Sequence, residues 1–142
     1  MLIRMVPDKV AEKWDIMKGC IHSALPPTSL DTEVHMTNIL EAILCGKMVC
    51  WAFEVEEQVK YLIVTQVIED DVTHTRNFFV FALVSILPVT MEEWQEGFIT
   101  LQTYAKYILC DLVSAYTKNP RIMQIVKHLG GDVETRYLQM PL

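Results

Sequence analysis

The stretch from residue 76 to residue 109 constrains the fold of this chain more strongly than any other part. Residues 76–87 form an almost unbroken run of β-branched, aromatic and aliphatic side chains, which predicts a strand buried on both faces. Thr90 and Glu93 have the spacing of a capping box, in which a hydroxyl and a carboxylate satisfy backbone N–H groups at a helix start. Apolar residues then recur every three or four positions, so we expect a helix of about five turns with one apolar face.

The N-terminal part of the chain predicts one strand followed by two helices. Residues 2–6 are expected to form a short strand, and Asp8 is expected to cap a single helix that ends before a pair of prolines. A second helix is expected to start at Thr28 or Ser29. It should end at Gly46, because glycine readily adopts the left-handed conformation of a helix C-cap.

The remaining segments predict a mixed sheet. Residues 49–55 and 60–68 read as strands that lead through short polar turns into the central strand, which favours an antiparallel meander. The long helix connects the central strand to a strand at 112–116, so these two strands should be parallel. Asn119 and the proline after it suit the start of another helix, and residues 134–140 are expected to form a last strand at the sheet edge.

The expected order of elements is therefore β-α-α-β-β-β-α-β-α-β. It predicts an α/β (α+β mixed) fold, in which an antiparallel meander plus one parallel βαβ step forms a sheet with helices on both faces. A chain of 142 residues suits a single domain over residues 1–142.

Composition excludes several classes of function. The net charge of −6 argues against non-specific nucleic-acid binding, which needs a basic face. The longest apolar run, residues 78–89, is shorter than the roughly 20 residues that a membrane span needs. The N-terminus lacks the charged-then-apolar pattern of a signal peptide, so we expect no secretion by that route. The four cysteines form no CxxC pair and read as small core residues.

Several residues could bind a metal or act in catalysis, but each has an ordinary structural explanation. Asp70, Asp71 and His74 lie on a polar turn, where acidic residues are common turn formers. The same holds for the cysteine pairs and for single histidines and serines: Cys20 with His22, Cys45 with Cys50, His35, His128, Ser85 and Ser114. A basic cluster around Asn119 could either meet a phosphate or form a solvated helix start; it comprises Lys118, Arg121 and Lys127. We therefore expect no metal site.

The order of elements over the whole chain resembles the GCN5-related N-acetyltransferase (GNAT) family, in its short, divergent bacteriophage form. Members of that family commonly read Asn-x-x-Ala-x-x-Leu-Tyr-x-x-x-Gly-Phe at the late helix. In this chain Asn119, Ile125 and Gly130 fall in register with that motif. Three further positions differ from it: Ile122 replaces the alanine, Val126 the tyrosine and Gly131 the phenylalanine. The resemblance implies the GNAT fold.

Two departures from the family pattern bear on activity. The tyrosine of the motif often protonates the departing thiolate in active members, and Val126 has no proton to donate. The family binds the coenzyme A (CoA) pyrophosphate on a glycine-rich turn between the central strand and the long helix. Here that turn has no glycine, Pro88 lacks an N–H, and Thr90 opens the capping box. Glu92 and Glu93 place two carboxylates where the phosphates would lie. We therefore expect no cofactor.

The leading interpretation is a catalytically degenerate acetyltransferase-like fold that acts as a phage structural, virion-associated or interaction protein. Its partners would be other phage or host proteins, with an oligomer allowed, and its location the virion or the host cytoplasm. The alternative is an acetyl-CoA-dependent N-acetyltransferase of an unknown amine, with the cofactor in a cleft between the central and fifth strands. Glu54 and Glu69, which flank strands bordering the acceptor site in active relatives, are the candidates for its general base. A third interpretation is an acidic inhibitor of a host protein.

Overall fold

A computed structural model describes residues 1–26 and 32–142, which form a five-stranded sheet in the order β1-β2-β3-β4-β5. The strands are β1 (Leu2–Arg4), β2 (Met48–Val55), β3 (Gln58–Glu69), β4 (Arg76–Ser85) and β5 (Leu112–Ala115). Neighbouring strands are antiparallel except β4 and β5, which are parallel. The predicted meander with one parallel step is therefore confirmed.

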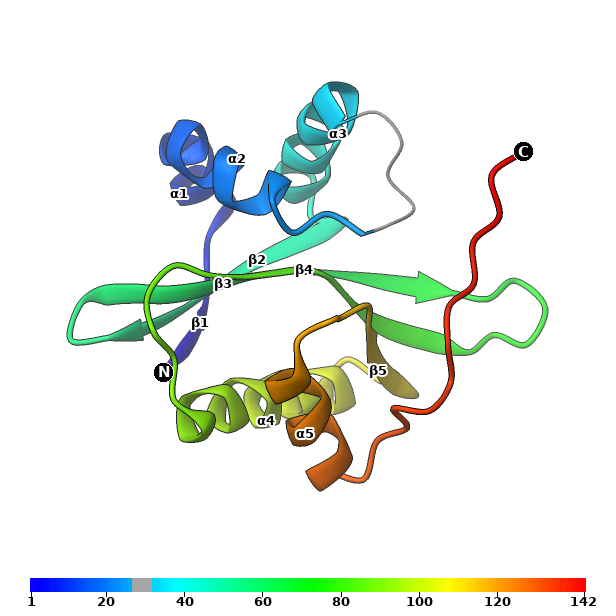
Figure 1. Cartoon of the computed structure of the whole chain (residues 1–142). Helices are drawn as coiled ribbons and strands as arrows, with labels where there is room; N and C mark the ends of the chain where they lie inside the picture. The colour runs from blue at the N-terminus through cyan, green and yellow to red at the C-terminus, as the bar shows by residue number, and fades with distance from the viewer. Residues whose placement is uncertain (27–31) are drawn as a thin grey trace.

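Helices cover both faces of the sheet, as expected (Figure 1). One face carries α1 (Pro7–Glu12), α2 (Trp14–His22) and α3 (Thr32–Leu44). The other carries α4 (Met91–Tyr107) and α5 (Pro120–His128). Among the described residues, no helix is long and apolar enough to cross a membrane.

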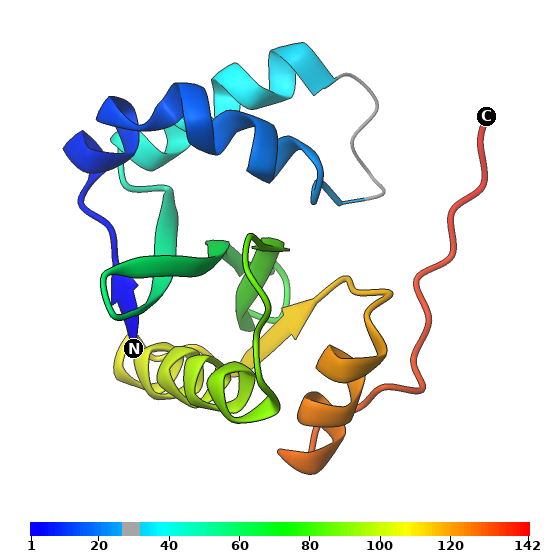
Figure 2. The ribbon, with the colours of Figure 1, turned by 60° about the vertical axis from the view of Figure 1, so that its left-hand side comes forward.

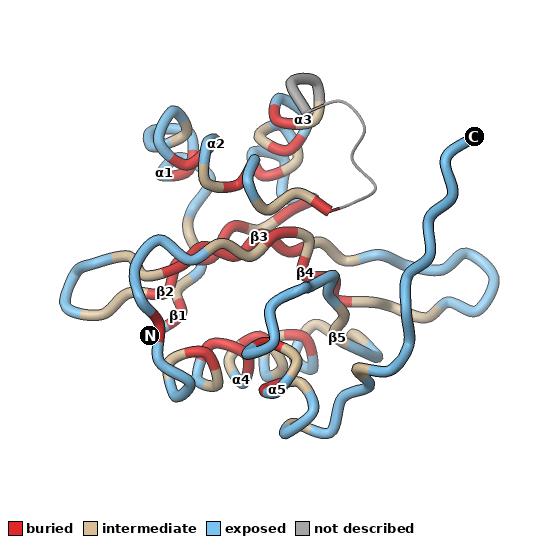
Figure 3. The backbone as a smooth tube through the Cα atoms, viewed as in Figure 1, coloured by how far each residue is buried: buried red, intermediate tan, exposed pale blue. Residues whose placement is uncertain are grey.

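Alternating side chains of the strands build one apolar cluster on each face of the sheet. The buried residues lie along the strands and on the helices that cover them (Figure 3). On β4, Phe78 and Val80 belong to the cluster under α4, whereas Ala82 belongs to the cluster under α1–α3. Burial on both faces is thus confirmed for the middle of β4, residues 78–82. The last residues of the predicted strand are not buried, because Ser85, Ile86 and Leu87 are exposed beyond the helices.

The N-terminal helical segment differs from the prediction. Val6 is the N-cap and Pro7 is the first helical residue, so Asp8 lies in the first turn and does not cap the helix. The helix also breaks at Lys13, giving α1 and α2. Val10 and Ile21 are both fully buried, which shows why the apolar period continues through the break. The predicted start at Thr28 or Ser29 lies outside the described residues, and Gly46 has the expected left-handed conformation, with φ 82°.

The last predicted strand is absent, and residues 129–142 form an extended tail without strand pairing. The carboxylate of Asp132 accepts hydrogen bonds from the N–H groups of Glu134 (2.8 Å) and Thr135 (3.2 Å). This local turn engages the N–H groups of the first two residues of the predicted strand. In the described part of the chain, residues 134–140 pair with no strand.

Candidate functional site

The sheet opens where β4 and β5 part, and we call this opening the fork. Pairing between these strands runs from Asn77 with Leu112 to Val80 with Ala115. Beyond that point β4 continues to Ser85, paired with β3 but not with β5. The register between β3 and β4 shifts at the same place, because Thr65 pairs with Val80 but Val64 pairs with Ala82. Phe81 is therefore an extra residue in β4. Such a bulge bends a strand, and this one turns β4 away from β5.

Free backbone groups line the β4 side of the fork. Alternate residues of 81–85 direct their N–H and C=O groups away from β3, toward the side that β5 occupies earlier in the strand. In the part of the chain that the structure describes, no strand pairs with that edge. An extended polar ligand could add to it as a partial strand would.

Two helix starts lie at the outer end of the fork. The side chain of Asn119 accepts a hydrogen bond from the N–H of Arg121, and Pro120 is the first residue of α5, as expected. The guanidinium of Arg121 donates to the backbone oxygen of Val89 at 3.4 Å. Arg121 thus bridges the start of α5 to the turn before α4, and Lys118 is an exposed second cation on the loop from β5. The third basic residue of the predicted cluster, Lys127, lies in the last turn of α5.

The capping box at the start of α4 is confirmed. The N–H of Glu93 donates to the Thr90 hydroxyl (3.2 Å), and the Glu93 carboxylate accepts from the N–H of Thr90 (2.9 Å). Lys60 on β3 also donates to this carboxylate at 2.6 Å, and the two side chains are only 20% and 17% exposed. The hydrogen bond from Lys60 and that from Thr90 hold the pKa of Glu93 below its ordinary value.

The capping box leaves two backbone N–H groups at the start of α4, those of Met91 and Glu92, without a hydrogen-bond acceptor in the described chain. The charge of Glu93 is neutralised by Lys60 and directed toward β3, whereas Glu92 is exposed beside the turn. Among the described residues, no protein group accepts from the N–H groups of Met91 and Glu92. These donors, the helix dipole and Arg121 are groups that favour an anion at this turn, which contains no glycine.

Tyr116 stands directly at the fork, although the sequence pattern indicated only a strand residue there. It follows the last paired residue of β5 and remains 42% exposed. Its ring packs edge-on against Phe79, with ring centres 5.3 Å apart, and in a tilted contact against Tyr137, with ring centres 4.9 Å apart. Val126, at the motif position of the acid, packs against the apolar cluster under α4. A tyrosine immediately after β5 was the available signal for a phenol at the fork.

The two predicted base candidates lie away from the fork. Glu69 pairs in register with Arg76 at the opposite end of β4, and their side chains are 3.5 Å apart. Glu54 lies on β2, which β3 separates from β4. Its N–H donates to the backbone oxygen of Met1. The structure brings neither carboxylate to the fork, and their catalytic role stays a prediction.

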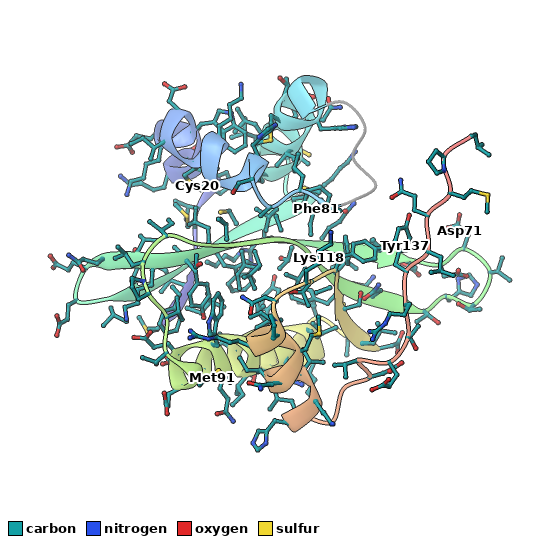
Figure 4. The ribbon with its side chains drawn as sticks, in the orientation of Figure 1. Cys20, Asp71, Phe81, Met91, Lys118 and Tyr137 are labelled. Atoms are coloured by element: carbon teal, nitrogen blue, oxygen red, sulfur yellow. The ribbon has the colours of Figure 1, made fainter. Side chains whose placement is uncertain are left out.

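The residues with metal-binding potential do not meet. Asp70 caps its own turn by accepting from the N–H groups of Val72 and Thr73, and Asp71 lies at the tip of this turn, far from Phe81 and Lys118 (Figure 4). Burial raises the pKa of the Cys50 thiol to about 12, which keeps it protonated and unreactive. Within residues 1–26 and 32–142 there is no group of three or more His, Cys, Asp or Glu side chains that could hold a metal ion.

Comparison with known structures identifies the fold. No protein-family model matches the sequence, and the search of curated proteins finds no match. Among solved structures, AAC(6')-Iy in complex with a CoA-containing bisubstrate analogue has a TM-score of 0.72 at 13% identity, covering 100% of this chain and 97% of that one. A predicted acetyltransferase from Clostridium acetobutylicum, solved with acetyl-CoA, has a TM-score of 0.66 at 11% identity, covering 99% and 95%. A ribosomal-protein-alanine N-acetyltransferase from Brucella melitensis has 0.67 at 7%, covering 100% and 99%. This chain therefore has the GNAT fold.

These neighbours contradict our leading interpretation of the sequence. We expected a degenerate phage structural or interaction protein without a cofactor, whereas the similar structures are acetyltransferases and several contain CoA or acetyl-CoA. The comparisons favour the alternative interpretation instead, and they give no support to a phage origin or a virion location. We expected no cofactor because the turn before α4 contains no glycine. The sequence pattern did not show that the fold brings Arg121 to this turn, where the N–H groups of Met91 and Glu92 are also free.

Proposed function

We propose that this chain is an acetyl-CoA-dependent N-acetyltransferase that acts on an amine. The observation that carries the proposal is the fork, which opens at a bulge of β4 in a fold shared along the whole chain with acetyltransferases solved with CoA. The chain's net charge of −6 favours a cationic acceptor, because a protein of one sign attracts ligands of the other.

The residues around the fork fit the two chemically different halves of CoA. The free edge of residues 81–85 offers backbone groups to the amides of the pantetheine arm. The N–H groups of Met91 and Glu92, with the side chains of Arg121 and Lys118, are suited to the phosphates. In this arrangement side-chain cations do what a glycine-rich turn does with backbone amides alone.

Tyr116 is the proposed proton donor. Bound acetyl-CoA would supply the acetyl group, so that a C–N bond to the amine forms and the C–S bond breaks. The thiolate takes its proton from the Tyr116 hydroxyl, and the proton that the amine releases restores that hydroxyl. Tyr116 brings a phenol hydroxyl to the end of the paired part of β5, whereas the motif position offers only Val126. A positioned acid of this kind contributes about 10²-fold or more to a rate.

Isothermal titration calorimetry with acetyl-CoA, and then with CoA, tests the proposal directly. We expect saturable binding of both. We also expect release of free CoA thiol with at least one member of an amine panel: an aminoglycoside, a polyamine and a peptide with a free N-terminus. No heat of binding with either cofactor would overturn the proposal.

A charge variant locates the cofactor on the fork. Arg121→Gln should weaken CoA binding about tenfold, because a charged hydrogen bond is worth about 1.5 kcal/mol. Lys127→Gln removes the same charge from the far end of α5 and should leave the affinity unchanged. Binding of S-acetylpantetheine, which lacks the pyrophosphate, should be equal in both variants. Equal CoA affinity of the two variants would place the phosphates elsewhere.

A further inference from the structure

A cavity of about 460 Å³ lies at the end of the sheet away from the fork. It is on the face under α4, which is the face opposite α1–α3 in Figure 2. The lining comes from the strands and from the last turns of α4, and includes Arg4, Val67, Phe78, Tyr104 and Ile108. None of the lining residues belongs to the fork or to the turn before α4, so this cavity is a separate place on the molecule.

Cations outnumber carboxylates around this cavity. Among the described residues, three of the chain's 12 lysines and arginines line it, Arg4, Lys47 and Arg76, against one carboxylate, that of Glu69. The chain as a whole carries a charge of −6, so this local excess runs against the overall balance. Because salt screens charges beyond roughly 8–10 Å, the nearby cations decide which ligand is attracted here, and they favour an anion.

The guanidinium of Arg76 has a donor left for a ligand. Its two contacts are long: Nη2 donates to the backbone oxygen of Ile108 at 3.4 Å, and Nη1 to the exposed carboxylate of Glu69 at 3.5 Å. Its Nε is buried and has no hydrogen-bond partner in the described chain. A buried donor without an acceptor is costly, and a small turn of this loosely held guanidinium would offer the Nε–H to an acceptor in the cavity.

Arg4 is fixed beside the same cavity by Tyr104. Its guanidinium donates to the Tyr104 hydroxyl at 3.3 Å and lies 5.9 Å from the centre of that ring. The ring itself packs edge-on against Trp51, with ring centres 5.0 Å apart. Since a guanidinium has five N–H donors, Arg4 keeps donors for a ligand, and its fixed position lowers the entropy cost of binding. Lys47 is exposed and adds a third positive charge.

We propose that this cavity binds a small organic dicarboxylate, with one carboxylate on Arg76 and the other on Arg4 and Lys47. Guanidinium groups match planar carboxylates through paired hydrogen bonds. The two arginines come from β4 and β1, with two strands between them, so they suit two separate carboxylates.

The remaining lining agrees with this class of ligand. Val49, Val67 and Phe78 offer apolar surface to a short carbon chain. A phosphate suits the cavity less well, because no helix N-terminus is among its described lining residues. The proposal is independent of acetyl transfer, since the cavity shares no residue with the fork.

Isothermal titration calorimetry with succinate, glutarate and adipate tests the proposal. At least one of the three should bind saturably with a Kd below about 1 mM, and butyrate, which has a single carboxylate, should bind about tenfold or more weakly. No saturable binding of any of the three dicarboxylates would overturn the proposal. Tighter binding of inorganic phosphate than of all three would overturn it too.

Charge variants locate the ligand. Arg4→Gln and Lys47→Gln should each weaken binding of the tightest dicarboxylate about tenfold, because each removes a charged hydrogen bond. Glu69→Gln removes the carboxylate that competes for Arg76 and should strengthen binding. Lys127→Gln removes one positive charge from α5 and is the matched control, which should bind as the parent chain does. Circular dichroism checks the fold of each variant, and the exposed Lys47 provides the test even if Arg4→Gln does not fold.

Two results with these variants would contradict the proposed site. Equal affinity of Lys47→Gln and Lys127→Gln would place the dicarboxylate elsewhere, and weaker binding by Glu69→Gln would show that the ligand does not bind Arg76. The same titration with saturating acetyl-CoA separates the cavity from the fork. An unchanged dicarboxylate affinity supports the separate cavity, whereas loss of binding would place the dicarboxylate on the fork and overturn the proposal.

Discussion

Contacts of one residue, Tyr61, fix the position of α4 against the sheet below the fork. The hydroxyl of Tyr61 on β3 donates to the backbone oxygen of Glu93 at 3.2 Å, and its ring stacks between Phe53 and Trp94. A Cβ atom at Gly97 would lie 1.9 Å from this hydroxyl, so only glycine allows the approach. Burial, with smaller contributions from nearby glutamates, raises the pKa of Tyr61 far above its usual range. Tyr61 is therefore a structural phenol, unlike the exposed Tyr116.

At the residue scale, Tyr116→Phe should lower kcat for acetyl transfer about 10²-fold while the affinity for CoA stays the same. The variant loses only the hydroxyl and keeps the ring contacts with Phe79 and Tyr137. Tyr107→Phe, at an 81% exposed tyrosine at the end of α4, is the control and should be as active as the parent chain. Unchanged kcat in Tyr116→Phe would show that another group protonates the thiolate.

The start of α4 is the element on which the site depends. The capping box determines where the helix begins and which N–H groups stay free, and the Lys60–Glu93 pair fastens that start to β3. Arg121 adds a contact from α5 on the other side of the turn. Contacts from β3, α4 and α5 thus meet at the turn between β4 and α4, which has about five residues and contains no glycine.

At this scale, the stabilising effect of Glu93 should depend on pH. Its folded-state pKa lies below its ordinary value of 4.5, so the stabilisation is complete above that value and is lost as the pH falls through the folded-state pKa. Glu93→Gln should lower the unfolding free energy by about 1–2 kcal/mol at pH 7, and the difference should shrink in acid. Urea unfolding between pH 7 and about pH 3 measures it.

Glu92→Gln is the matched control for that series. Glu92 occupies the same helix turn but is exposed and has no hydrogen bond from a side chain in the described chain. The unfolding free energy of the Glu92→Gln variant should equal that of the parent chain at every pH. If the two variants lose the same stability throughout, the Lys60–Glu93 pair does not stabilise the fold.

At the scale of the whole molecule, the fork lies between two parts that only a short ladder joins. β3 and β4 pair over nine residue positions, whereas β4 and β5 pair over four. β5, α5 and the tail therefore depend on a short ladder and on packing against α4. A ligand in the fork contacts both sides and should couple them.

Cofactor binding should therefore stabilise the whole chain. CoA at 100 times its dissociation constant should add about 2.7 kcal/mol to the unfolding free energy, or about 9 °C in Tm for a chain of this length. ADP at the same concentration has phosphates but no pantetheine arm, and it should raise Tm by much less. Equal shifts in a thermal melt would mean that residues 81–85 do not bind the arm.

Local patterns in the sequence determined most of the elements. The capping box, the Asn119–Pro120 start and the glycine C-cap each depend on interactions within a few residues. The meander and the parallel step follow from short turns and from one helix-length connection, which leave few topologies open. The helix break at Lys13 and the unpaired tail were not predictable in this way, because neither changes the apolar period.

The candidate site was decided by the tertiary structure. Phe81 is a bulge only because β3 and β4 pair in one particular register, and Arg121 meets Val89 across 32 positions of sequence. Whether the tail finds a strand to pair with depends on an edge that another part of the chain leaves open. Such contacts join residues that are distant in sequence, so no local pattern records them, and the binding groups become visible only when the strands are in place.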